Sequence, residues 1–257
     1  RMERASIALE DLNIGATAVG TGLNASPEYV KLVIEKLRSY TGFNLRSAKN
    51  LISITQFMDD FVELSNTLKT LAVDMTKIAN DIRLMSSGPV TGLGEINLPP
   101  VQPGSSIMPG KVNPVIAEAM NMVAFQVIGN DLTVTLASQA GQLELNVMMP
   151  VIAFNLIQSL HILKNSIHVF TERLVLGITA NEERCREMVE RSPGIALALN
   201  PYIGFDAVAK VVQEAITTGK TIREIVLEKN LLPKDMLDKI LDLYSMTELG
   251  KKKVKQK

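Results

Sequence analysis

The feature that most constrains the fold is an apolar ladder between residues 57 and 85. Its members recur in alternating steps of four and three: Phe57, Phe61, Leu64, Leu68, Leu71, Met75, Ile78, Ile82 and Met85. Such steps keep side chains on one face of an α-helix, and about four heptads of them are typical of long helices packed side by side. The ladder therefore predicts one long helix that ends at Ser86-Ser-Gly-Pro89, and we assign its methionines to packing.

Two further long apolar segments follow, over residues 115–140 and 147–176. Each is apolar on more than one face, and a helix of that kind is buried on most sides. A chain of 257 residues supplies too few other elements to surround both, so these segments predict association between subunits. A shorter helix is expected from Pro27, with Ser26 as its N-cap and Gly42 as its end.

Composition changes near residue 183. Beyond this point the chain is more charged, and glycine or proline interrupts it at short intervals. We therefore expect two domains. Residues 1–183 would form a central long-helix bundle that carries a loop at 104–114, and residues 184–257 would form a small helical C-terminal domain. No segment shows strand alternation of useful length, so the predicted fold class is all-α.

Charge and cysteine content exclude several functions. Lys and Arg number 27 and Asp and Glu number 27, a balance that gives no sign of a nucleic-acid partner. The single cysteine, Cys185, cannot form an internal disulfide and fits a reducing cytoplasm. The most apolar stretches contain polar residues such as Asp131 and Asn155, so we expect no membrane span. Two histidines without a spaced set of further ligands predict no metal site, and we expect no cofactor.

The segment from Gly104 to Pro114 concentrates polar groups. It reads Gly-Ser-Ser-Ile-Met-Pro-Gly-Lys-Val-Asn-Pro, and its glycines and prolines identify it as a loop. Two hydroxyls, from Ser105 and Ser106, accompany the ammonium of Lys111 and the amide of Asn113. Such a surface suits a small carboxylate, and an ordinary connector between helices is the alternative interpretation.

This segment resembles, at every position, the signature loop of the fumarase/aspartase superfamily, whose members eliminate water, ammonia or an amine to release fumarate. Further motifs of the superfamily match along nearly the whole chain, at Gly15–Asn24, Lys77–Arg83, Ser87–Pro89, Glu144–Val147 and Leu199–Gly204. The resemblance implies a central bundle of long helices, assembly as a homotetramer with composite active sites, and a small helical C-terminal domain.

The reaction explains which groups the loop should carry. Forming fumarate requires a base for a weakly acidic C–H group, fixed donors for the neighbouring carboxylate and exclusion of water. By its match to the motif, Ser105 is implied to be the base, acting as an alkoxide. Its charge would be stabilised by Lys111 and by the backbone N–H groups from Ser106 to Met108.

The remaining positions of the motif imply further roles. Lys111 and Asn113 match positions that bind the substrate carboxylate, and the loop residues Ser106, Ile107 and Met108 complete the implied binding set. Glu118 matches a glutamate that orients a histidine near the leaving group. Without the motif, Glu118 would be read as a first-turn residue that favours the helix dipole.

Residues outside the loop favour one branch of the superfamily. Segments 115–118, 127–131, 140–148 and 226–232 resemble aspartate ammonia-lyases more than fumarases. The implied reaction is the reversible elimination of ammonia from L-aspartate to give fumarate, which makes the chain a carbon–nitrogen lyase with a small dicarboxylate substrate. A class II fumarase, which converts L-malate to fumarate and water, is the alternative.

One part of the superfamily pattern is missing from this sequence. The superfamily builds each active site from three sequence regions that belong to three subunits, and only the third is matched here. We find no counterpart of the Gly-Ser/Thr-Ser-x-x-Asn-Met-Asn segment, nor of the Thr-x-x-His segment whose histidine pairs with Glu118. We therefore expect the chain to be the C-terminal part of a longer enzyme and to be inactive alone. A truncated, non-catalytic helical assembly fragment is the remaining alternative.

Overall fold

The structure is a computed structural model that describes residues 1–247. Residues 248–257, the last of the predicted C-terminal domain, lie outside this described part. The chain divides into two compact units, with the division between Thr179 and Ala180. Compactness does not test whether a unit folds by itself, so the domain boundary expected at residue 183 stays a prediction. The predicted all-α class is confirmed, because helices form nearly all regular structure and each strand has only two residues.

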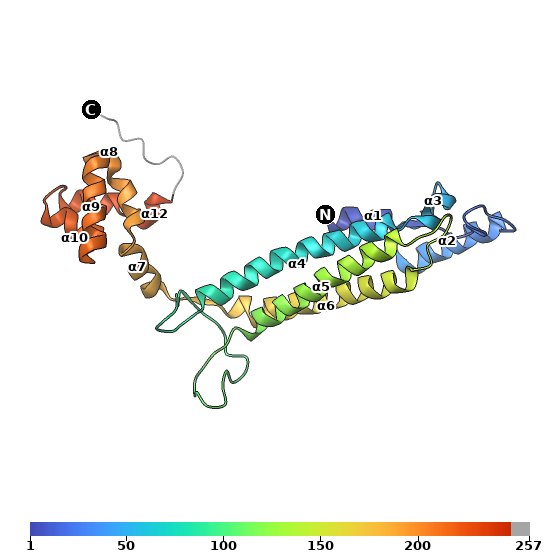
Figure 1. Cartoon of the computed structure of the whole chain (residues 1–257), viewed down its shortest axis with the longest axis horizontal. Helices are drawn as coiled ribbons and strands as arrows, with labels where there is room; N and C mark the ends of the chain where they lie inside the picture. Colours follow the sequence, from blue (N-terminus) through green and yellow to red (C-terminus); the bar gives the residue numbers. More distant parts are fainter. Residues whose placement is uncertain (248–257) are drawn as a thin grey trace. The chain divides into compact units, whose positions relative to one another are not determined.

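Three long helices form the centre of unit 1 (Figure 1). They are α4 (Asp59–Met85), α5 (Val115–Gln139) and α6 (Met149–Arg173), and α5 packs against both of the others. The short helix α1 (Met2–Ala8) lies beside the first half of α4. The sequence predicted the three long helices, but it did not single out α1.

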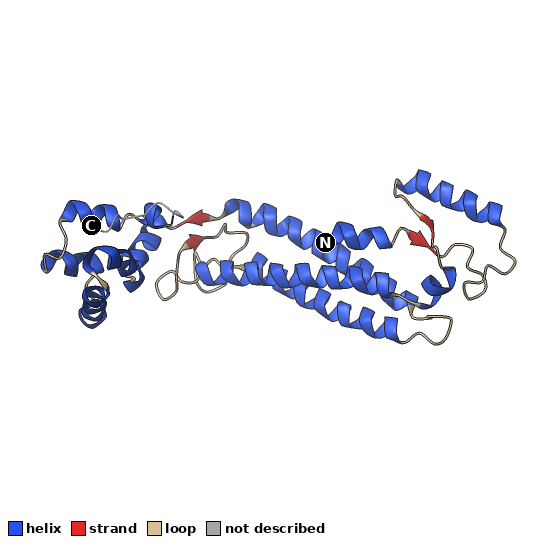
Figure 2. Ribbon diagram, turned by 90° about the horizontal axis from the view of Figure 1, so that it is seen from above, coloured by secondary structure: helices blue, strands red, loops and turns tan. Residues whose placement is uncertain are grey.

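Smaller elements complete unit 1. Figure 2 shows the strands β1 and β2 side by side, and their residues pair in parallel. The bounds are β1 Asp11–Leu12, α2 Pro27–Thr41, β2 Arg46–Ser47, α3 Leu51–Gln56, β3 Ile96–Asn97 and η1 Val175–Gly177. The last strand, β4 Thr179–Ala180, spans the division between the two units. The prediction for α2 is confirmed in detail, since Ser26 Oγ accepts the N–H of Tyr29 and Gly42 ends the helix with φ of 73°.

The apolar ladder accounts for α4, except at its first member. Phe57 is extended and 58% exposed, and the helix begins only at Asp59, so the predicted start is two residues too early. Acidic residues at 59 and 60 explain this start, because they favour the N-terminal end of the helix dipole. Ala72 and Ala79 are fully buried, and small residues of this kind let α5 approach α4 closely.

Both α5 and α6 leave large apolar side chains uncovered. The most exposed are Met122, Phe125, Leu132 and Leu136 on α5, and Phe154, Ile157 and Leu160 on α6. The sequence predicted helices too apolar for one chain to cover, and the exposure of these side chains agrees with that reasoning. No helix among residues 1–247 reaches the length and apolarity that crossing a membrane requires.

Unit 2 has its own apolar core, centred on Leu199, Ile222, Ile225 and Leu237. Its helices are α7 Glu182–Glu190, η2 Pro193–Leu199, α8 Asn200–Ile203, α9 Phe205–Thr218, α10 Ile222–Glu228, α11 Lys234–Ile240 and α12 Leu243–Met246.

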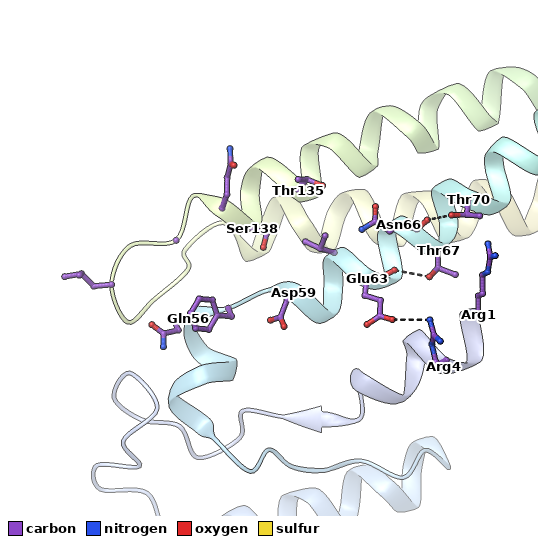
Figure 3. Close-up of a pocket in the computed structure, with 15 residues that line it drawn as sticks. Arg1, Arg4, Gln56, Asp59, Glu63, Asn66, Thr67, Thr70, Thr135 and Ser138 are labelled. Carbon is purple, nitrogen blue, oxygen red and sulfur yellow. Dashed lines mark hydrogen bonds and ion pairs between the residues drawn. The ribbon is translucent and has the colours of Figure 1, made fainter.

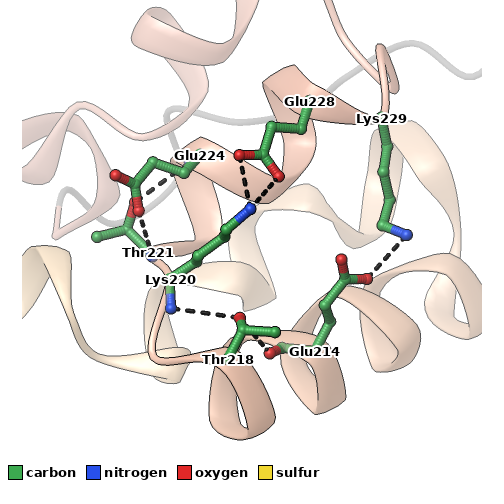
Figure 4. A network of polar contacts seen from close by, with 7 residues as sticks. All are labelled: Glu214, Thr218, Lys220, Thr221, Glu224, Glu228 and Lys229. Carbon is green, nitrogen blue, oxygen red and sulfur yellow. Dashed lines mark hydrogen bonds and ion pairs between the residues drawn. The ribbon is translucent and has the colours of Figure 1, made fainter.

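A capping box starts α10, in which Thr221 and Glu224 each accept the other's backbone N–H (Figure 4). The backbone N–H of Thr221 lowers the pKa of the Glu224 carboxyl. Ion pairs from Lys220 to Glu228 and from Lys229 to Glu214 surround this cap at 2.7 and 2.8 Å.

Candidate active site

The signature loop lies at the end of the bundle where α4 ends and α5 begins. It belongs to the long connection from Ser86 to Pro114, drawn below the start of α5 in Figure 1. Glu118 follows in the first turn of α5. The loop and the glutamate that the sequence analysis singled out therefore belong to adjoining segments of unit 1.

Two hydrogen bonds close the base of the loop. The backbone N–H of Gly104 donates to the carbonyl of Lys111 at 3.1 Å, and Asn113 Nδ2 donates to the carbonyl of Gly104 at 2.6 Å. A Cβ at position 104 would lie 2.2 Å from the Lys111 oxygen, so only glycine permits this approach. We call these two bonds the loop clasp.

Ser105 sits directly inside the clasp. Its Oγ accepts the backbone N–H groups of Ile107 at 3.2 Å and Met108 at 3.1 Å, and the residue is half-buried. Two donors aimed at one oxygen favour negative charge on it, which is the condition that a serine base requires. Lys111 makes no hydrogen bond or ion pair to Ser105, so the backbone supplies the local stabilisation.

The other residues expected in the site face solvent or contact the backbone. Ile107 is 84% exposed and Met108 is 49% exposed, while Ser106 and Lys111 are also exposed. Within residues 1–247, the ammonium of Lys111 has no hydrogen-bond partner. Asn113 is the one that contacts the backbone, because its amide donates to the Gly104 carbonyl. The amide has a second N–H, so this bond leaves it able to donate to a carboxylate as well.

Glu118 is half-buried, and its carboxylate has no hydrogen bond or ion pair among the described residues. Neither histidine shares a hydrogen bond or ion pair with it: His161 and His168 both lie on α6, and His161 contacts Asn165 at 3.0 Å. Glu118 therefore lies next to the loop without a polar partner among residues 1–247. In the described part of the chain, no three acidic, histidine or cysteine side chains gather as a metal site.

A hollow of unit 1 lies away from the loop. It is an open groove of about 750 Å³ between α1, the first half of α4 and the end of α5 (Figure 3). Arg4 and Glu63 approach to 4.0 Å in it, and the hydroxyls of Thr67 and Thr70 are bound to carbonyls of their own helix. The two ends of α5, with 25 residues, are separated by about 37 Å, so this groove cannot contribute to the loop of the same chain.

A second hollow of about 230 Å³ is lined by Asp60 and Asp11, together with apolar side chains. Burial raises the pKa of the Asp60 carboxyl, and the negative charges of Asp59, Asp11 and Glu63 raise it further. Asp11 is itself paired with Arg46 at 2.5 Å. This acidic hollow was not predicted, because its members come from separate segments that only the fold brings together.

Sequence reasoning also missed the loop clasp. The sequence does mark the two ends of the loop, since Gly104 follows Pro103 and Asn113 precedes Pro114. A glycine beside a proline predicts a turn, but it does not reveal which carbonyl the backbone will approach.

Comparison with known proteins finds two family profiles along the chain. Residues 1–129 match a family profile described as Lyase, and residues 195–248 match one described as Fumarase C C-terminus. An aspartate ammonia-lyase from a Bacillus species is 56% identical over 94% of this chain and 52% of its own length. The chain thus spans about half the length of the curated relatives it matches.

Solved structures share the fold. A fumarate lyase:delta crystallin from Brucella melitensis, bound to cobalt, superimposes with a TM-score of 0.93 at 45% identity over 96% of this chain and 54% of that one. A class II fumarase from Schistosoma mansoni gives 0.84 at 36% identity over 93% and 53%. Since the Lyase profile accounts for just over half of its residues, the chain belongs to this lyase family and to the fumarase/aspartase superfamily.

Proposed function

We propose that this chain supplies the signature loop, and with it the base, to composite active sites that eliminate ammonia from L-aspartate to give fumarate. The observation that carries the proposal is Ser105, whose Oγ accepts two backbone N–H groups inside a loop that matches the superfamily motif. The 56% identity to an aspartate ammonia-lyase favours ammonia as the leaving group.

In the proposed reaction, the Ser105 alkoxide removes a proton from the β-carbon of L-aspartate, which is next to the β-carboxylate. The electron pair of that C–H bond forms the double bond as the C–N bond breaks, and ammonia leaves. Lys111 and Asn113 bind the carboxylate on which charge accumulates, and Ser106, Ile107 and Met108 line the same site. The exposure of Lys111 supports this role, since its ammonium is not engaged by the described residues.

The site is proposed to require further segments from other subunits. Glu118 is half-buried without a partner among residues 1–247, which fits a carboxylate that receives a histidine from another polypeptide. The exposed apolar faces of α5 and α6 fit association, and we propose a homotetramer. We further propose a cytoplasmic enzyme, because the single Cys185 suits a reducing compartment.

A fumarase is the second candidate, and the similarity to the Schistosoma mansoni enzyme is the observation that favours it. Both candidates release fumarate, so ultraviolet absorbance follows either reaction. We expect the pure chain to be silent with L-aspartate and with L-malate, because its loop lacks the partner segments. Turnover of either substrate by the pure chain would contradict the need for other segments, and the substrate consumed would name the leaving group.

A further inference from the structure

The apolar pattern alone does not fix how far α4 slides along α5. The ladder on α4 repeats every heptad, and α5 is apolar on several faces, so a shift of seven residues again brings apolar side chains together. Such a shift moves the helices by about 10.5 Å. The long connection 86–114 permits this movement, whereas α5 and α6 are joined by the shorter connection 140–148, in which Asn146 donates to the carbonyls of Ala137 and Ser138.

A buried polar layer crosses the α4–α5 contact in the half of the bundle farther from the loop. Asp131 is 5% exposed, and its two oxygens accept from Ser65 Oγ at 2.8 Å and from Lys69 Nζ at 2.6 Å. Ser65 is also buried, and Lys69 Nζ makes a further bond to Asn66 at 2.7 Å. A buried carboxylate without a cation or donors is strongly destabilising, so this layer is satisfied only when these residues face each other.

We propose that the polar layer of Ser65, Lys69 and Asp131 selects the register of α4 against α5. After a slip of seven residues in one direction, Asp131 would face Ala72 and Thr76. After a slip in the other direction, it would face Met58 and Val62. Neither arrangement supplies a cation, so both leave a buried negative charge unpaired.

A second contact agrees with this register. Asn121 Nδ2 on α5 donates to Asn80 Oδ1 on α4 at 2.7 Å, in the half of the bundle nearer the loop. The register matters for the site, because α5 begins where the loop ends. A slip of one heptad would displace Glu118 by about 10 Å relative to α4.

The register can be measured as a distance between two exposed positions. Nitroxide labels at Arg83→Cys on α4 and Gln139→Cys on α5, with Cys185→Ser, are separated by about 35 Å in the observed register. A slip of one heptad changes this distance by about 10 Å, which pulsed electron–electron double resonance resolves. Dilution with unlabelled chain removes distances between subunits.

The decisive variant replaces the ion pair by apolar residues, Lys69→Met with Asp131→Leu. We expect a second distance, shorter or longer by about 10 Å, to appear beside the native one. The matched control, Lys77→Met with Asp81→Leu, removes an ion pair that lies within α4 alone and should keep the single native distance. A single native distance in the decisive variant would overturn the proposal.

A second variant tests the same proposal if the double substitution Lys69→Met with Asp131→Leu loses its helix content. It exchanges residues one heptad apart, Ser65 with Ala72 and Lys69 with Thr76, and so keeps the composition and moves the donors by seven positions. We expect the labels to lie about 10 Å closer, because Asp131 follows the displaced lysine. Retention of the native distance would overturn the proposal, because the register would then not depend on the position of the lysine.

Discussion

The loop clasp makes Asn113 a structural residue as well as a proposed ligand, and Asn113→Ala tests the structural part by itself. The substitution removes the donor to the Gly104 carbonyl and leaves the bond from Gly104 to Lys111. A typical intramolecular hydrogen bond contributes about 1 kcal/mol net, and at most about 1.5 kcal/mol for a neutral pair of this kind. The open form of the loop should therefore become about fivefold more populated, with about tenfold as the upper bound.

Limited trypsin digestion reports this opening, because Lys111 lies inside the clasp and its peptide bond must leave the loop to enter a protease. When opening is fast relative to cleavage, the rate follows the population of the open form. We expect cleavage after Lys111 to accelerate about fivefold in Asn113→Ala. Cleavage after Lys49, in an exposed bend at the other end of unit 1, provides the internal reference and should not change.

Two further variants separate the hydrogen bond from side-chain volume. Asn113→Asp has the same shape but cannot donate to a carbonyl, so it should be cleaved at least as fast as Asn113→Ala. Gln102→Ala removes an exposed amide outside the clasp and should behave as the native chain. If Asn113→Ala and Asn113→Asp are both cleaved at the native rate, the clasp does not hold the loop and the reasoning is refuted.

Two other predictions concern stability. Because burial and neighbouring carboxylates raise the pKa of Asp60, the free energy of unfolding falls as the pH rises through that pKa. Asp60→Asn should therefore stabilise unit 1 against urea at neutral pH, and the gain should shrink as the pH approaches 3.8, the ordinary value; an equal gain at both pH values would contradict this cause. Thr221→Ala should lower the thermal stability of unit 2 by about 1 kcal/mol, and Thr221→Ser should restore most of it, because the cap needs only the hydroxyl.

The sequence anticipated the long helices because their signals are local and repeated. The ladder on α4, the cap at Ser26 and the break at Ser86 all act within one or two helical turns, and each has its counterpart in the structure. The start of α4 was misplaced because Phe57 continues the apolar spacing although it is not helical. The apolar periodicity shows which face of the helix is apolar, but it does not show at which residue the helix begins.

The sequence predicted which residues belong to the candidate site, but not how these residues contact one another. The motif named Ser105, Lys111 and Asn113, yet only the folded loop reveals that Asn113 bonds the Gly104 carbonyl. The partners of Asp131 were likewise hidden, because Lys69 is 62 residues away in sequence and the pairing depends on the helix register. The spacing of residues along a single sequence does not reveal which residues of distant segments come into contact.

The central claim is that this chain provides the base to a site shared between polypeptides. It is tested most directly by mixing the chain with the Bacillus aspartate ammonia-lyase in which the residue aligned with Ser105 is replaced by alanine, and by measuring fumarate release. The account predicts that the mixture consumes L-aspartate although each component alone is silent, and that a Ser105→Ala chain abolishes this recovery. A silent mixture in which the two polypeptides co-purify, or a recovery that survives Ser105→Ala, would contradict it.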